Sequence, residues 1–259
     1  MRLTAVRRTA ALAASSAALA LLTTACGGSA DDGGEPGGDK AAGGTTAAAK
    51  PLTAAELEKA ALTQADVDSG KVITDLPAGD DIAEEQVKSD DEACLPLAHA
   101  QAGVASGEPA ATVKRSWTGA PGKPSADTPP EEAVLAALDV PKVLVTLASY
   151  DGGGAGQVLK DLEGAAQKCA KGFTATVDGE KAEYTEVTTT EAPSGGDQAL
   201  AVTMTVNVED GVTPPMKLVV VRKGATVASF SAVNLASMAS GKDFAFPTEI
   251  VDAQLGKLN

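Results

Sequence analysis

The sequence is poor in aromatic residues and in positive charge, and each shortage argues against a class of function. Aromatic residues make up 3% of the 259 residues, which is too few for the exposed aromatic platform of a polysaccharide-binding module. Basic residues number 21 against 35 acidic ones, and the net charge is −14 at neutral pH. Binding to nucleic acid requires clustered Lys and Arg that neutralise phosphates. We therefore expect no nucleic-acid partner.

Histidine is also scarce, and this leaves little material for catalysis or metal binding. His99 is the single histidine and so the single candidate imidazole base. No Gly-x-Ser-x-Gly elbow, dinucleotide-binding fingerprint or P-loop occurs in the sequence. A metal site needs more His and Cys ligands than the chain offers. We expect a non-enzymatic protein without a cofactor or a metal ion, with His99 on the surface or at a helix end. The alternative is a hydrolase that combines His99 with a serine and a carboxylate.

Long apolar runs are absent after the first 25 residues, so no membrane-spanning helix is predicted there. At the N-terminus, three Arg within the first eight residues precede an uncharged stretch rich in Ala and Leu. This pattern is typical of a secretory signal peptide. The stretch ends in Leu22-Thr23-Thr24-Ala25-Cys26, which resembles a bacterial lipobox. The resemblance implies removal of residues 1–25 and attachment of a diacylglycerol to Cys26; a plain signal peptide that leaves Cys26 as a free thiol is the alternative.

Residues 26–51 are predicted to form a flexible tether behind the lipidated cysteine. Gly27–Lys50 contains eight Gly, six Ala and no large apolar residue, so it cannot bury enough surface to offset chain entropy. Such a tether spans about 25–30 Å. Without residues 1–25 the chain has 18 basic and 35 acidic residues, and its net charge of −17 repels anionic headgroups. We therefore expect attachment to the extracytoplasmic face of the cell membrane through the lipid on Cys26.

Residues 52–259 are predicted to form a single α+β domain. Thr53 and Glu56 form a capping box that opens a first helix, and further helices are expected at 92–102, 155–171 and 247–258. Strands joined by short glycine-containing turns follow the third helix, which indicates an antiparallel meander. The helices are expected to pack mainly on one face of this sheet. The predicted strands are 72–76, 112–117, 143–147, 174–177, 182–190, 198–208, 216–222 and 226–235.

Cys94 and Cys169 are predicted to form a disulfide. Both lie on apolar faces of predicted helices, in a chain that carries an export signal, and disulfides persist beyond the membrane. Their bridge closes a loop of about 75 residues, which stabilises the fold by ~4–5 kcal/mol in the chain-entropy model. The alternatives are metal ligation and a nucleophilic thiol. His99 lies five residues after Cys94 and therefore faces another side of the helix.

A series of motifs follows the lipobox cysteine in a fixed order. Leu52–Leu57 has the pattern Leu-Thr-x-Ala-x-Leu, Cys94 opens a Cys-x-Pro-Leu-Ala motif, and Leu147–Asp151 precedes the helix that ends in Cys169. Gly172-Phe173, Val219–Gly224 and the terminal residues Pro247, Gln254, Lys257 and Leu258 complete the series. Together these motifs resemble cell-envelope lipoproteins of actinobacteria and, more distantly, the PknH-like extracellular sensor domain of actinobacterial receptor kinases.

The resemblance implies an α+β domain in which a disulfide-tied helix packs on an antiparallel sheet beside a cleft for an unknown ligand. It favours a lipid-anchored protein with a non-catalytic domain that binds a small molecule or a protein. No ligand-binding residue carries over from the family to this sequence. Sensor domains of this type have two disulfides, whereas this sequence has cysteines for one besides Cys26. Besides the His99 hydrolase, a lipid-carrying or structural envelope factor with an apolar cleft is an alternative.

Overall fold

The computed structural model describes residues 49–122, 125, 127–208 and 211–258. The predicted signal peptide, Cys26 and almost all of the predicted tether lie outside the described residues. Those that are described belong to one compact unit, residues 46–259. This unit contains its own hydrophobic cores and its own disulfide, which are the properties of a part of a chain that folds by itself.

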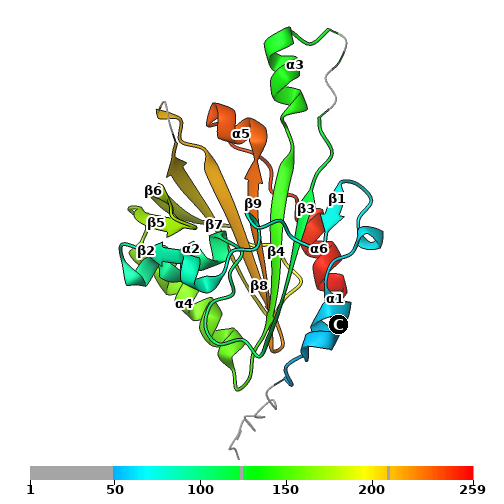
Figure 1. Cartoon of the computed structure of the whole chain (residues 1–259), viewed down its shortest axis with the longest axis vertical. Helices are drawn as coiled ribbons and strands as arrows, with labels where there is room; N and C mark the ends of the chain where they lie inside the picture. Colours follow the sequence, from blue (N-terminus) through cyan, green and yellow to red (C-terminus); the bar gives the residue numbers. More distant parts are fainter. Residues whose placement is uncertain (1–48, 123–124, 126, 209–210, 259) are drawn as a thin grey trace, which may run out of the picture. The chain divides into compact units, whose positions relative to one another are not determined.

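An antiparallel sheet forms the centre of the unit (Figure 1). Its strands are β1 (Lys71–Ile73), β2 (Val87–Ser89), β3 (Ala111–Thr118), β4 (Pro141–Ser149), β5 (Phe173–Val177), β6 (Glu180–Thr190), β7 (Gln198–Asn207), β8 (Pro215–Lys223) and β9 (Thr226–Asn234). Their order in the sheet is β1-β3-β4-β9-β8-β7-β6-β5-β2. Strands β5 to β9 therefore form an uninterrupted meander, and the predicted α+β class with an antiparallel meander is confirmed.

Short turns chosen by local sequence set the register of this meander. Asp178 and Gly179 join β5 to β6 with φ angles of 50° and 85°, the left-handed pair that a two-residue hairpin requires. Gly supplies this conformation without strain, and Asp is among the few other residues that tolerate it. The register then places Tyr184 of β6 opposite Phe173 of β5. The two rings stack with their centroids 4.7 Å apart.

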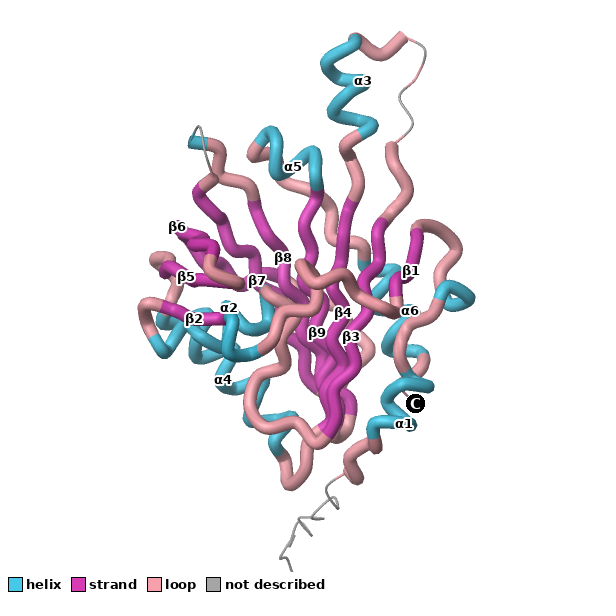
Figure 2. Tube along the Cα trace, viewed as in Figure 1, coloured by secondary structure: helices cyan, strands magenta, loops and turns pink. Residues whose placement is uncertain are grey.

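Helices cover both faces of the sheet (Figure 2). On the first face lie α2 (Leu95–Gln101) and α4 (Gly154–Lys168), and on the second face lie α1 (Ala54–Ala60) and α6 (Thr248–Gly256). This differs from the expectation that helices pack mainly on one face. The reason is the composition of the central strands: in β8, Leu218 and Val220 belong to the first core, while Val219 and Val221 belong to the second. A strand that is apolar at consecutive positions needs cover on both sides.

Two short helices complete the fold beside the ends of β4 and β9. Helix α3 (Pro130–Ala137) lies between β3 and β4 and has no buried residue, whereas α5 (Leu235–Ser240) directly follows β9. Helix α3 was not among the predicted helices, although Pro130 and the acidic pair Glu131 and Glu132 are typical of a first helical turn. Single 3-10 turns occur at Gln64–Asp66, Glu84–Gln86 and Glu92–Cys94.

A buried glutamine joins the two helices of the second face. The side chain of Gln254 in α6 is fully buried, and its Oε1 accepts a hydrogen bond of 2.9 Å from the Leu62 N–H. Its Nε2 donates to the Ala60 carbonyl over 2.7 Å. Both groups lie just after or at the end of α1, which begins at the predicted Thr53–Glu56 capping box. Gln254 therefore satisfies backbone groups that the helix end leaves unpaired.

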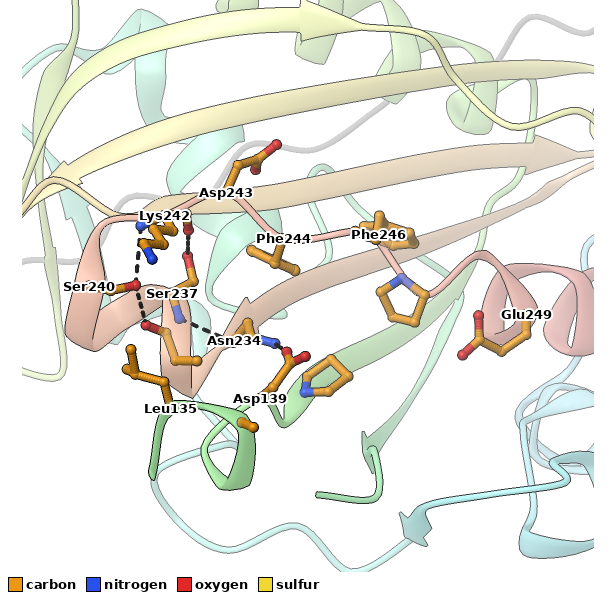
Figure 3. Close-up of a pocket in the computed structure, with 15 residues that line it drawn as sticks. Leu135, Asp139, Asn234, Ser237, Ser240, Lys242, Asp243, Phe244, Phe246 and Glu249 are labelled. Carbon is orange, nitrogen blue, oxygen red and sulfur yellow. Dashed lines mark hydrogen bonds between the residues drawn. The ribbon is translucent and has the colours of Figure 1, made fainter. Parts of the chain in front are cut away.

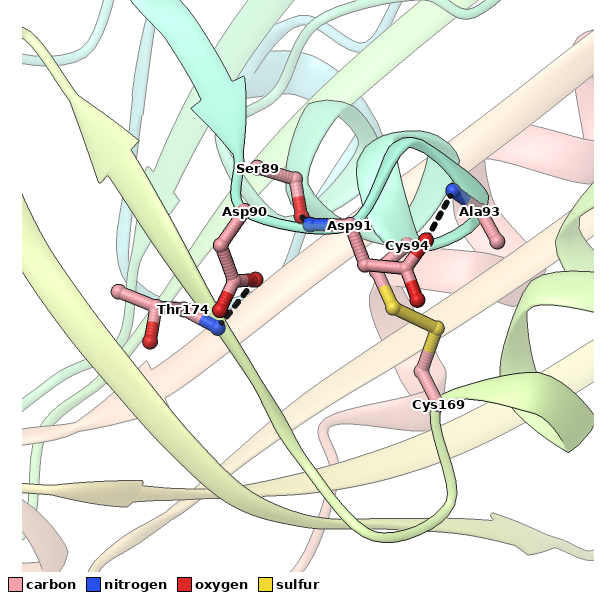
Figure 4. The surroundings of a disulfide bond; sticks show 7 residues. All are labelled: Ser89, Asp90, Asp91, Ala93, Cys94, Cys169 and Thr174. Atoms are coloured by element: carbon pink, nitrogen blue, oxygen red, sulfur yellow. Dashed lines mark hydrogen bonds between the residues drawn. A yellow bond between two sulfur atoms is a disulfide. The ribbon is translucent and has the colours of Figure 1, made fainter.

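A disulfide joins Cys94 to Cys169, as predicted (Figure 4). Cys94 immediately precedes α2 and Cys169 is the C-cap of α4, and both residues are almost wholly buried. Nearby, Asp91 accepts a hydrogen bond of 2.9 Å from the Ala93 N–H, and Asp90 accepts one of 2.9 Å from the Thr174 N–H. The disulfide holds the start of α2 against α4, Asp90 joins the preceding segment to β5, and Asp91 caps the 3-10 turn that leads into α2.

The disulfide gives a direct prediction. In protein that is denatured without reductant, alkylation should leave Cys94 and Cys169 unmodified, and both should become modified after reduction. Replacing both cysteines by serine should lower the free energy of unfolding by about 4–5 kcal/mol, because the unfolded chain regains the entropy of a long loop. Mass spectrometry of the alkylated peptides and urea unfolding measure the two effects. Modification of both thiols without reduction would contradict the assignment.

Candidate functional site

The cavity beside α5 has a polar lining, and several of its polar groups are already engaged (Figure 3). The Asn234 amide donates a hydrogen bond of 2.7 Å to Asp139, and its Oδ1 accepts one of 3.1 Å from the Ser237 N–H. Asp243 forms an ion pair with Lys217 at 2.8 Å, and this hydrogen bond holds the pKa of Asp243 below its usual value. These contacts cap α5 and fix the segment after it. We assign this cavity of about 620 Å³ a structural role.

A larger and more apolar cavity opens on the first face of the sheet. It has a volume of about 740 Å³, which lies within the usual range for small-molecule sites. We call it the α2 cleft, because the end of α2 forms one of its walls. It is lined by Gly79, Ile82, Gln101, Ala102, Leu144, Val177, Asp178, Glu180, Lys181, Ala182, Tyr184, Val206, Asn207, Val208, Met216 and Met238.

The strand period explains why the lining is apolar. Side chains two residues apart lie on the same face of a strand, so Ala182 and Tyr184 of β6 line the cleft together. Val206 of β7 and Met216 of β8 come from the neighbouring strands of the meander, and Met238 comes from α5. Apart from Met238, all of these side chains belong to the first core or pack against it. The cleft is thus an accessible extension of that core.

Ion pairs hold the loop around residues 79–82, which supplies Gly79 and Ile82 to the lining of the cleft. Lys142 binds Asp80 at 2.5 Å, and Lys114 binds Asp81 at 3.2 Å. The Lys114 ammonium also donates a hydrogen bond of 2.6 Å to the carbonyl of Ile82, whose side chain lines the cleft. The two lysines come from β4 and β3. The loop is therefore fixed to the sheet at three successive residues.

Gln101 is the most informative residue of the cleft. It lies in the last turn of α2 and is 6% exposed, yet its side-chain oxygen has no hydrogen-bond partner among the described residues. Its backbone carbonyl is satisfied, because it accepts a hydrogen bond of 2.7 Å from the Ser231 hydroxyl. A buried polar group without a partner costs about 1–3 kcal/mol. Such a group in the lining of a cavity is a candidate contact for a ligand.

Tyr184 provides a second polar group in the same lining. Its side chain is 4% exposed, and burial raises the pKa of its hydroxyl to about 12. The hydroxyl therefore stays protonated at neutral pH and can donate a hydrogen bond. The charged residues of the lining, Asp178, Glu180 and Lys181, are all exposed and belong to the β5–β6 hairpin.

His99 lies apart from the cleft. It is 7% exposed, which corrects the expectation of a surface or helix-end position, because the last five residues of α2 are all buried. Burial lowers the pKa of its imidazole, and the nearby Glu84 opposes this effect. Among the described residues, no serine or carboxylate forms a hydrogen bond with the imidazole.

Cys26, the predicted lipidation site, lies outside the described residues, and the described part contains no cluster of three His, Cys, Asp or Glu side chains suited to a metal ion.

Positive charge gathers where the described chain begins. Two adjoining cavities of about 530 and 300 Å³ share Ala49, Gly224 and Ala225 in their linings. Among the described residues that line them, Glu56 is the one acid. The cations there are Lys50, Lys59, Lys160, Arg222, Lys223 and Lys257. Arg222 is paired with Asp197 at 3.0 Å and Lys257 with Asp66 at 2.8 Å. This local distribution reverses the acidic balance of the chain as a whole.

Comparisons with known proteins give a likeness to a solved structure and no match by sequence. Neither a protein-family model nor a curated protein sequence matches the chain. Among solved structures, the extracellular domain of PknH from Mycobacterium tuberculosis is similar, with 11% sequence identity and a TM-score of 0.44 over 81% of this chain and 95% of that chain. At this identity and TM-score the assignment of a function rests on the site itself. No helix among the described residues is long and apolar enough to cross a membrane.

The burial of His99 predicts a pH dependence of stability. The pKa of the folded state lies below the ordinary value of 6.5, so the unfolded chain binds a proton that the folded chain resists. The free energy of unfolding should therefore fall as the pH drops below about 6.5, by at most about 1.4 kcal/mol per pH unit. In a His99→Gln variant this part of the loss should vanish. Urea unfolding of both proteins between pH 5 and 7.5 measures the difference, and parallel curves would show that His99 contributes none of it.

Proposed function

We propose that the chain is a lipid-anchored extracytoplasmic protein whose unit 46–259 binds a ligand in the α2 cleft without catalysing a reaction. The observation that carries this proposal is the cleft itself: an apolar cavity of about 740 Å³ whose lining residues include Gln101, a buried residue with an unpaired side-chain oxygen. Ligand sites are usually largely apolar cavities with a few placed polar groups.

The position of His99 favours binding over hydrolysis. A triad needs an imidazole within hydrogen-bond reach of a nucleophile and of an orienting carboxylate. His99 is buried in α2, and neither contact exists among the described residues. It also lines none of the four cavities described above, nor the cavity formed by Thr190, Thr203 and Phe246 on the second face. A non-catalytic, sensor-like role fits this arrangement better than the envelope hydrolase.

The extracytoplasmic location has its own support in the disulfide. A buried disulfide between α2 and α4 is typical of proteins that fold in an oxidising compartment. The charged N-terminus and the apolar stretch that follows it provide a route of export. The lipid on Cys26 would then hold the exported chain at the membrane surface, with residues 26–51 as the tether.

The cations around Ala49 fit the proposed orientation. A tether that ends at Ala49 brings this end of the unit toward the membrane, and each Lys or Arg near an anionic surface contributes about 1 kcal/mol of attraction. The net charge of −17 in the chain without residues 1–25 predicts repulsion, but Glu56 is the one acid among the described residues that line these two cavities. Local charge therefore offsets part of the repulsion that the whole chain experiences.

The anchor can be tested at a single atom. A Cys26→Ala variant keeps the export signal and lacks the sulfur that accepts the diacylglycerol, so the ~0.8 kcal/mol per buried CH₂ that holds the chain in the bilayer disappears. The wild type should stay with membranes and incorporate an alkyne fatty acid, whereas the variant should remain unlabelled. Click labelling after metabolic feeding measures this. Lipid incorporation into the variant would show that the anchor lies elsewhere.

Binding in the α2 cleft can be tested with a neutral reporter dye. Nile red should bind to residues 46–259 with a rise in fluorescence, and a Met238→Trp variant should bind it at least about 10-fold more weakly, because the larger ring occupies part of the cavity. Thr203→Trp places the same ring in the cavity on the second face and serves as the matched control. Thermal unfolding confirms that both variants fold. Equal binding by all three proteins would overturn the assignment of the cleft.

A further inference from the structure

We infer that the ligand of the α2 cleft is a neutral amphiphile: an apolar chain lies in the cleft, and an uncharged head forms hydrogen bonds with the Gln101 carboxamide. This inference deepens the proposed function and rests on it, because it names the chemical class that the same cleft accepts. Three properties of the cleft lead to it: the nature of its apolar walls, the one unpaired group within it, and the distribution of charge around it.

The walls favour a flexible apolar chain over a rigid polar molecule. Leu144, Val206, Met216 and Met238 contribute apolar side chains to the lining from three strands and a helix. Met216 and Met238 have unbranched side chains that adapt to ligands of different shape. Burial of apolar ligand surface against such walls supplies the main favourable free energy of binding.

The missing hydrogen-bond partner of the Gln101 side chain indicates the chemistry of the ligand's head group. The carboxamide oxygen is a hydrogen-bond acceptor, and it has no partner among the described residues. A hydroxyl or an amide N–H can donate a hydrogen bond to this oxygen. Because the residue is 94% buried, a neutral head satisfies it without the large cost of moving a charge out of water.

The charges around the cleft argue against an ionic head. Lys181 is the one cation among the lining residues, it is exposed, and Glu180 and Asp178 lie beside it on the same hairpin. Lys114 and Lys142, which support the adjacent loop, are already paired with Asp81 and Asp80. An anionic head at Gln101 would find no free buried cation among the described residues. A cationic head would find no buried carboxylate in the lining either, since both acids are exposed.

Three probes with the same ten-carbon chain separate these possibilities: 1-monodecanoylglycerol is neutral, decanoate is anionic and decylamine is cationic. Titration calorimetry on residues 46–259 at pH 7.5, below the micellar concentration, should show the glyceride binding at least about 10-fold more tightly than either ion. A Gln101→Leu variant, which keeps the size of the side chain, should weaken glyceride binding by about 2- to 12-fold. Binding of decanoate should change little, and Met238→Trp should abolish binding of the glyceride.

The outcomes distinguish this inference from the proposed function. Tighter binding of decanoate or decylamine than of the glyceride, or an unchanged glyceride affinity in Gln101→Leu, would overturn the neutral head. If Nile red binding is lost in Met238→Trp while none of the three probes binds, the cleft remains a ligand site and the amphiphile is wrong. If neither Nile red nor any probe responds to Met238→Trp, both the inference and the proposed function fail.

Discussion

Burial of the central strands on both faces is the constraint on which the rest of the structure depends. Strand β8 is apolar at four consecutive positions, Leu218 to Val221, and these side chains divide alternately between two cores. Neither face can be left to solvent, so helices must pack on each. On the first face α2 is too short to be stable by its own hydrogen bonds, and the disulfide to α4 fixes its start. The position of the α2 cleft follows, because Gln101 ends the helix that is held in this way.

Most of the secondary structure could be predicted from local sequence signals. The five strands of the meander are separated by Asp-Gly, Gly-Gly and Lys-Gly pairs, and α4 shows apolar residues at helical spacing on one face, so both could be predicted without tertiary information. The disulfide could also be predicted, because Cys94 and Cys169 are the two cysteines besides Cys26 and the chain carries a predicted export signal. The helices of the second face could not be placed by such signals, since their position depends on which strands become central.

The candidate site depends on contacts that no local pattern reveals. Leu144, Tyr184, Met216 and Met238 come from distant parts of the chain, and the order of the strands alone brings them together. Gln101 did carry a signal, because it shares the apolar side of its helix with Cys94 and Leu97, where a polar residue is unexpected. The burial of His99 had no comparable signal: α2 is enclosed on several sides, and a seven-residue helix does not indicate this by its sequence.

The strands that line the cleft also fix its distance from the point where the chain enters the unit. Met216 near the start of β8 lines the α2 cleft, whereas Arg222 near its end lines the cationic cavity beside Ala49. In β7, Asn207 at the end of the strand lines the α2 cleft, and Gln198 at its start lines the cationic cavity. At about 3.3 Å per residue, a strand of this length separates the two sites by roughly 20–30 Å. On the proposed anchoring, the cationic end faces the membrane and the cleft lies toward the other end of these strands. A cleft so placed samples amphiphiles outside the bilayer that holds it, which fits a sensor of released molecules better than a protein that extracts lipid from its own membrane.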